Sequence, residues 1–116
     1  MERLRYSYVK SLFEKKNLDE REALFLLKHF SDALSYIPAH MLNDRAFAIE
    51  VVKIDGMLLG RLPDDLHWDK EVVSCAVREN PMAIKFADQS LLHDEEIMKV
   101  ARDSYANYLK NIRDYN

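Results

Sequence analysis

The residues of this 116-residue chain that could bind a metal or transfer a proton are few, and the four histidines are the first to consider. Two imidazoles three or four positions apart on one helix could share a metal ion, and a histidine beside a nucleophile could act as a base. No two of the four have that spacing; they are His29, His40, His67 and His93. We therefore interpret them as surface or joint residues.

Cys75, the single cysteine, could serve as a nucleophile only if its thiol were ionised. Ionisation is favoured beside a basic group or at the start of a helix, and Cys75 falls in the middle of an expected helix. We predict a partly buried, apolar role for it. With one cysteine the chain cannot form an internal disulfide, which agrees with a reducing compartment.

Asp64, Asp65 and Asp69 form the densest group of carboxylates. Paired carboxylates can carry out acid–base chemistry or hold a divalent ion. Turn formation and helix capping explain these three residues more simply, and the run PDDLHWD offers too few oxygen ligands for calcium. We therefore predict no catalytic residue, no metal, no cofactor and no small-molecule ligand.

A binding surface is easier to locate than a reactive one. Trp68 is the best candidate for a partner contact, because tryptophan is favoured at interface hot spots, although it could instead pack onto Val73. His93 follows Trp68 by 25 residues, which is the interval at which the sequence repeats. Asp64 and Asp65 lie beside Trp68, so we group these four as candidate partner-binding residues. Aromatic residues near the two ends of the chain could close the core or mediate self-association; the candidates are Tyr6, Tyr105 and Tyr108.

These candidates must be positioned by elements that recur at a fixed interval. Aspartates recur at a constant 25-residue interval, each preceding an apolar helical pattern; they are Asp19, Asp44, Asp69 and Asp94. An aspartate in this position can cap a helix N-terminus, and Glu22 would complete a capping box with Asp19. Pro38 and Pro63 fall in the same register and are expected to follow the ends of shorter helices.

The apolar pattern predicts a first helix over residues 2–15, capped longer helices, and shorter helices that end near Ile37, Leu62 and Ala87. Two dipeptides form the joints between a capped longer helix and the next shorter helix; they are Asp55-Gly56 and Asn80-Pro81. Asp55 and Asn80 are expected to relax into a left-handed cap. A single closing helix is predicted from about Glu95 to Arg113, since no breaker interrupts it. Phe30 and five pairs in register are predicted to face the core; the pairs are Val9 and Leu12, Leu34 and Ile37, Leu59 and Leu62, Ile84 and Ala87, and Leu109 and Ile112.

With two glycines, three prolines and helical spacing throughout, the fold class is all-α. We predict an α-solenoid-like stack of about four 25-residue helix-pair repeats with longer terminal helices, forming one domain over residues 1–116. The expected units are residues 6–30, 31–55, 56–80 and 81–105, followed by a closing helical segment to residue 116.

The stretch from Asp69 to Asp88, DKEVVSCAVRENPMAIKFAD, resembles the bacterial and protist repeat family known as domain of unknown function 4116. The resemblance is strong over residues 56–101, fair over 31–55 and weak before residue 31. Pro81 stands where that family more often has glycine, and a turn that starts a helix can accept either residue. The resemblance implies a tandem helical fold and supplies no catalytic residues.

Composition restricts the function classes. Apolar residues at 48% and charged residues at 32% fit a globular protein, and we expect a cytoplasmic location, because no apolar run could span a membrane or act as a signal peptide. Five cations against two acids give residues 1–17 a charge of +3, so the rest carries −6. This acidic body argues against nucleic-acid binding by the basic first helix.

We therefore predict a non-catalytic module that binds another protein or its own copy. Nucleic-acid binding through the basic first helix, with interleaved tyrosines for stacking, is the alternative. An enzyme with an unrecognised site between repeats is a third, less favoured hypothesis.

Overall fold

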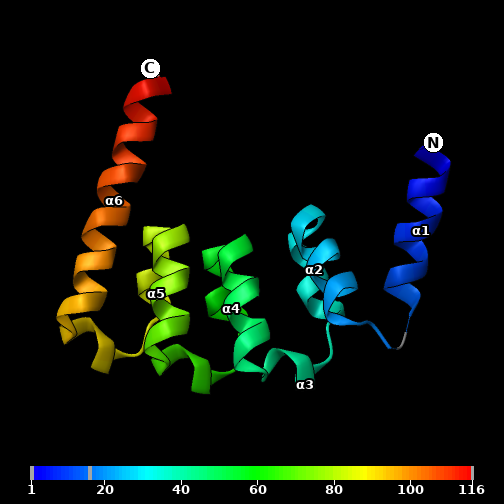
Figure 1. Ribbon diagram of the computed structural model, residues 1–116, viewed down its shortest axis with the longest axis horizontal. Coiled ribbons are helices and arrows are strands. Elements are labelled where there is room, and N and C mark those ends of the chain that lie inside the picture. The colour runs from blue at the N-terminus through cyan, green and yellow to red at the C-terminus, as the bar shows by residue number, and fades with distance from the viewer. Residues whose placement is uncertain (1, 16, 116) are drawn as a thin grey trace.

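The computed structural model describes residues 2–15 and 17–115, and the side chains of residues 7–15, 17–30 and 32–112. Every regular element in these ranges is a helix, so the all-α prediction is confirmed (Figure 1). In chain order the α-helices (α) and 3₁₀-helices (η) are α1 (Glu2–Glu14), α2 (Glu20–His29), η1 (Ser31–Tyr36), α3 (Ala39–Leu42), α4 (Arg45–Ile54), η2 (Gly56–Arg61), η3 (Asp64–Trp68), α5 (Lys70–Glu79), η4 (Pro81–Phe86), η5 (Gln89–His93) and α6 (Glu95–Tyr115).

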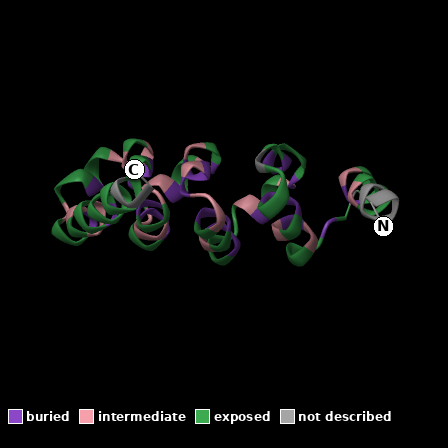
Figure 2. Ribbon diagram, turned by 90° about the horizontal axis from the view of Figure 1, so that it is seen from above, coloured by how far each residue is buried: buried purple, intermediate pink, exposed green. Residues whose placement is uncertain are grey.

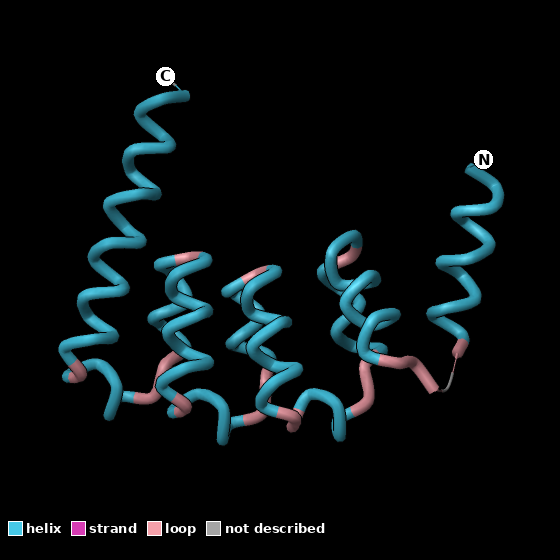
Figure 3. The backbone as a smooth tube through the Cα atoms, viewed as in Figure 1, coloured by secondary structure: helices cyan, strands magenta, loops and turns pink. Residues whose placement is uncertain are grey.

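The helices form two rows in a flat body that measures 46 × 39 × 16 Å. The longer helices α2, α4, α5 and the first half of α6 pack in chain order, while η2 packs on η4 in the second row. The 3₁₀-helices η1, η2 and η4 also pack on the longer helix that precedes each of them, whereas η3 and η5 pack on the longer helix that follows. Short loops join the elements (Figure 3). The helices α1 and α6 stand at opposite ends of the body (Figure 1).

The four aspartates cap helices as predicted. Asp19 accepts a hydrogen bond from the Glu22 amide at 2.8 Å, and the Glu22 side chain accepts one from the Asp19 amide, which completes the capping box. Asp44, Asp69 and Asp94 each accept hydrogen bonds from the amides two and three residues further along. The capping carboxylates thus satisfy amides that have no partner within the helix.

The prediction of a left-handed cap at the joints is wrong. Phe30, Asp55 and Asn80 all have extended backbones, with φ of −142°, −151° and −146°. The side chains of Asp55 and Asn80 explain the difference, because each accepts a hydrogen bond from the amide two residues on, at 3.0 and 2.9 Å. One residue therefore ends the longer helix and caps the 3₁₀-helix that follows, and an extended conformation suits both roles.

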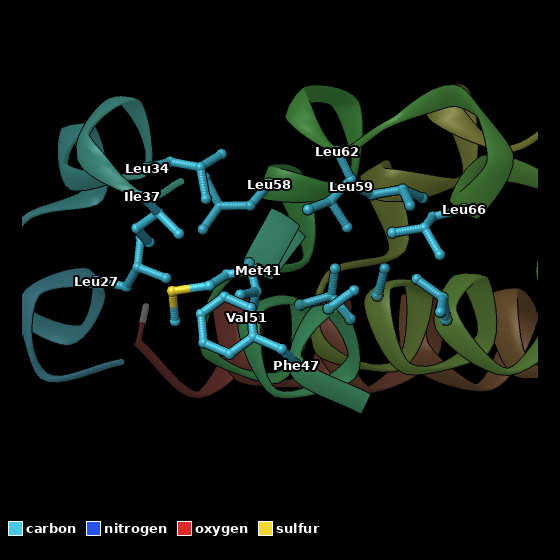
Figure 4. Packing of buried hydrophobic residues seen from close by; sticks show 14 of the residues in the cluster. Leu27, Leu34, Ile37, Met41, Phe47, Val51, Leu58, Leu59, Leu62 and Leu66 are labelled. Atoms are coloured by element: carbon cyan, nitrogen blue, oxygen red, sulfur yellow. The ribbon is translucent and has the colours of Figure 1, made fainter. Parts of the chain in front are cut away.

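The short helices η1, η2 and η4 end near the predicted positions, because their C-cap residues are Ile37, Leu62 and Ala87. The core lies between the two rows, where side chains of the longer helices meet those of the short ones (Figures 2 and 4). Phe47 from α4 and Leu59 from η2 are both almost fully buried. Burial of such side chains contributes about 2 kcal/mol each to folding.

Three residues expected in the core are exposed instead. Phe30 is 42% exposed because the extended joint turns it away from the interior. Leu109 and Ile112 are 43% and 42% exposed, because α6 continues without a joint through Tyr105 and Ala106 and carries them beyond α5. The single long closing helix itself was predicted correctly. Among the described residues no helix combines the length and the apolar character needed to cross a membrane.

Candidate functional site

An apolar cleft of 630 Å³ opens between α1 and the α2–η1 pair. We call it the aromatic cleft, because rings from both sides form most of its wall. Its lining residues are Tyr8, Val9, Lys10, Phe13, Glu14, His29, Phe30 and Tyr36. Clefts lined by apolar and aromatic side chains with a few polar groups are typical of binding sites.

The rings of the aromatic cleft hold one another in edge-to-face geometry. The Phe13 ring centroid lies 5.7 Å from that of Phe30 and 4.7 Å from that of Tyr36, with interplanar angles of 66° and 70°. Such pairs stabilise ring positions by about 1 kcal/mol beyond burial. Tyr36 nevertheless stays 57% exposed and Phe30 42% exposed, so large apolar surfaces face solvent in a fixed arrangement.

Two contacts position α1 against α2 and so form the cleft. Leu12 is the buried anchor of α1, with 2% of its surface exposed. Lys15 then donates to both carboxylate oxygens of Glu22, at 2.8 and 2.9 Å. This hydrogen bond raises the pKa of Lys15 above its ordinary value. The same glutamate belongs to the capping box of α2, so helix capping and helix docking share one side chain.

The structure places the candidate partner-binding residues elsewhere. Asp64, Asp65 and Trp68 lie on η3, and His93 lies on η5, at the edge of the body where the chain turns from one longer helix to the next (Figure 1). The two turns are joined by the Asp88 amide, which donates to the His67 carbonyl at 2.9 Å. Trp68 is 53% exposed, so any packing covers only part of its ring. None of the four lines the aromatic cleft.

The tyrosines of α6 are part of a larger apolar surface. Tyr105 and Tyr108 are 49% and 47% exposed, and they share one face of α6 with the exposed Leu109 and Ile112. The spacing of three, four and seven residues places all four on adjacent turns of that face. We call these four residues the terminal stripe. Tyr6 lies outside the residues whose side chains are described.

A second surface that sequence reasoning missed is a series of ion pairs across consecutive longer helices. Arg45 binds Asp69 at 2.5 Å and also Glu71, and Lys70 binds Asp94 and Glu96, both at 3.1 Å. Cations and acids each recur at the same 25-residue interval, so the signal was present in the sequence. At the equivalent positions of α2 and α4 the chain has Glu20 and Ala46, which cannot form this ion pair.

The ion pairs change the acidity of the capping aspartates. Burial alone would raise the pKa of Asp69, but hydrogen bonds from Arg45 and from the α5 amides hold that pKa below its ordinary value. The hydrogen bond from Lys70 likewise lowers the pKa of Asp94. Both carboxylates are therefore held in the charged form that helix capping favours.

A model of one protein family matches most of the chain. It is described as domain of unknown function (DUF4116), and it matches twice, over residues 19–67 and 69–114. The chain belongs to this family. The two DUF4116 matches begin at Asp19 and Asp69, a separation of twice the interval between capping aspartates. No curated protein and no solved structure matches the chain.

The surfaces differ in their relation to the DUF4116 matches. The terminal stripe lies inside the second match, and Trp68 is the single residue between the two. The aromatic cleft combines Phe30 and Tyr36 from the first match with residues of α1, which precedes it. In the described part of this DUF4116 chain, no three histidine, cysteine, aspartate or glutamate side chains are grouped to hold a metal. The partial burial predicted for Cys75 is confirmed.

Proposed function

We propose that the chain is a non-catalytic, cytoplasmic protein-interaction module whose aromatic cleft receives an apolar helical segment of a protein. The observation that carries this proposal is the cleft itself, with ordered but half-exposed rings at Tyr8, Phe30 and Tyr36. Rigid aromatic side chains provide large contact areas and lose little conformational freedom on binding, and they are enriched at interface hot spots.

The proposed scaffold is a short α-solenoid of helix-pair units. Support comes from three features that share the 25-residue interval: capping aspartates, extended joints and inter-helix ion pairs. Each unit buries its apolar face against the next, so apolar surface stays open mainly at the ends. The aromatic cleft is lined in part by α1. This helix stands at one such end (Figure 1).

The charges near the cleft favour a protein over a nucleic acid as the partner. Lys15 already donates to Glu22, which offsets one of the positive charges of the first helix. Lys10 and Glu14 face the cleft together, so its rim carries both signs of charge. Phosphate binding requires a concentrated positive field, whereas a mixed polar rim around an apolar centre is typical of protein interfaces.

Affinity capture tests the proposal. The purified chain is immobilised, incubated with lysate of its native host, and compared with the variants Tyr36→Lys and Trp68→Lys. Both replace an aromatic residue that is more than half exposed, so the charge added is the same and only its location differs. We expect proteins retained by the wild-type chain and by Trp68→Lys to be lost with Tyr36→Lys. If Trp68→Lys loses them and Tyr36→Lys does not, the docking surface is the η3 edge; if nothing is retained, the proposed function fails.

A further inference from the structure

We propose that the segment received by the aromatic cleft is the terminal stripe of a second copy of this chain. This inference rests on the proposed function, since it names the partner of the same cleft. The stripe consists of Tyr105, Tyr108, Leu109 and Ile112, all between 42% and 49% exposed. Two arguments from the structure select a second copy as the occupant.

The first argument is that the stripe continues an established interface of the chain. Ile97 and Ser104 of α6 are buried, and Ser104 donates to the Arg78 carbonyl of α5 at 3.2 Å. Beyond Ser104 the apolar face runs on along α6 with no helix beside it (Figure 1). A face that is apolar by helical spacing and continuous with a buried face is typical of an interface that lacks its second half.

The stripe also carries the register of the chain's own core. Leu109 and Ile112 stand one repeat interval after Ile84 and Ala87, and four intervals after Val9 and Leu12 of α1. Leu12 packs into the core, and Val9 is partly buried against it beside the cleft. The stripe therefore has the same apolar pattern as α1. We expect it to fit the surface at the α1 end of the body, which a helix with this pattern already contacts.

The second argument is geometric. The free ends of α1 and α6 project from the same side of the flat body, at its two ends (Figure 1). A two-fold axis between two copies brings the stripe of each to the cleft of the other, so both contacts form together and the assembly closes as a dimer. Tyr8, Phe30 and Tyr36 line the cleft and are 53%, 42% and 57% exposed, so the cleft side of α1 is accessible.

The area available is sufficient for a stable dimer. With about 200 Å² for a fully exposed large side chain, the half-exposed stripe supplies roughly 350 Å² and the cleft rings supply a similar amount. Two reciprocal contacts then bury roughly 1,400 Å², which falls within the range of about 1,200–2,000 Å² for specific interfaces. A single contact would bury about half of this and would be weak.

The test is sedimentation velocity of the full chain over a range of micromolar concentrations. We expect a dimer for the wild type and a dissociation constant raised about 100-fold in Leu109→Glu, since each of two contacts loses about tenfold in affinity. Asn107→Glu is the matched control, because Asn107 is exposed on the opposite side of α6 from the stripe, and this variant should remain dimeric. Circular dichroism confirms that each variant is folded.

Mixing two defective variants tests which surface receives the stripe. Tyr36→Lys should also be monomeric, because its cleft carries a charge. An equal mixture of Leu109→Glu and Tyr36→Lys should regain a dimer, since one contact is native and the other pairs the new acid with the new base. The inference is overturned by a monomeric wild type, by a mixture that stays monomeric, or by Tyr36→Lys remaining dimeric. A monomeric wild type that still captures another protein through the cleft would leave the proposed function intact.

Discussion

Replacing Gly56 by alanine should destabilise the fold more than any other single methyl added to the second row of helices. Gly56 is buried at the start of η2, where its backbone approaches α5. A Cβ atom built there would lie 2.2 Å from the Ala76 carbonyl oxygen and 3.0 Å from its carbonyl carbon. An ordinary carbon–oxygen contact is roughly 3.3 Å, so η2 would have to move from α5 by about an ångström.

That displacement has two further consequences. It would separate the Gly56 amide from Glu79, whose carboxylate accepts from it at 2.6 Å, and it would open the core around Leu59. Overpacking costs typically about 1–3 kcal/mol, and rigid backbone on the opposing side puts Gly56→Ala at the upper end, about 3 kcal/mol. The reduced entropy of the unfolded chain offsets less than about 1 kcal/mol of this loss.

Gly60→Ala is the matched control, because the same substitution is made four residues later in the same helix. Its Cβ would lie 2.6 Å from the Phe86 ring, which is a side chain that can rotate away, so we expect a loss below about 1.5 kcal/mol. Urea unfolding followed by circular dichroism measures the loss in free energy of unfolding for both variants. On heating, Gly56→Ala should lower the melting temperature by roughly 10 °C. Equal stability of Gly56→Ala and the wild type, or a larger loss in Gly60→Ala, would refute the argument from backbone proximity.

Three further predictions concern the capping aspartates, the ion pairs and the missing joint of α6. Because folding lowers the pKa of Asp69 and Asp94, their charged forms stabilise the fold at neutral pH, and this contribution is lost as the pH falls below about 4. In urea unfolding, the difference in free energy of unfolding between pH 7 and pH 3 should be smaller for Asp69→Asn than for the wild type. An equal difference would contradict the assignment. Arg45→Met should destabilise the fold slightly at low salt and less at high salt, because its ion pairs are exposed and screened by salt. A loss that does not change between low and high salt would rule out an electrostatic origin. Replacing Tyr105 and Ala106 together by Asn and Pro should end α6 near Ser104. The amides of the following residues should then exchange hydrogen at rates different from those of the wild type. Unchanged exchange rates would show that these two positions do not decide where the joint forms.

The parts of the fold that could be predicted from the sequence are those set by local chemistry. An aspartate caps the helix that begins beside it whatever lies further away, so Asp19 and Asp69 were assigned correctly. Prolines limit helices through their own ring, so the ends at Ile37 and Leu62 were also correct. The joints were mistaken because the Asp55 side chain offers two solutions, a left-handed turn or an extended cap, and the hydrogen bond to the Met57 amide decides between them.

The aromatic cleft could not be predicted because it depends on the distance and angle between helices. Phe13 and Tyr36 belong to different helices, α1 and η1, and their apolar character predicts burial as readily as exposure. The ion pairs were predictable in principle, since Arg45 and Lys70 share a register, but a pattern of charges on a surface has no meaning until the facing helix is known. Trp68 is 53% exposed, which is compatible with the sequence-based prediction of a contact residue.

The two ends of the chain show how one sequence pattern gives a core in the middle and a surface at the edge. Leu59 and Leu62 are buried because the extended Asp55 turns their helix back against α4. Leu109 and Ile112 keep the same register, but Tyr105 and Ala106 replace the residues that would turn the chain, and the helix continues. The apolar pattern that this chain uses for its core is therefore left exposed on α6, where the joint is lost, so an interface at this end requires only the loss of a helix breaker and no new apolar residue.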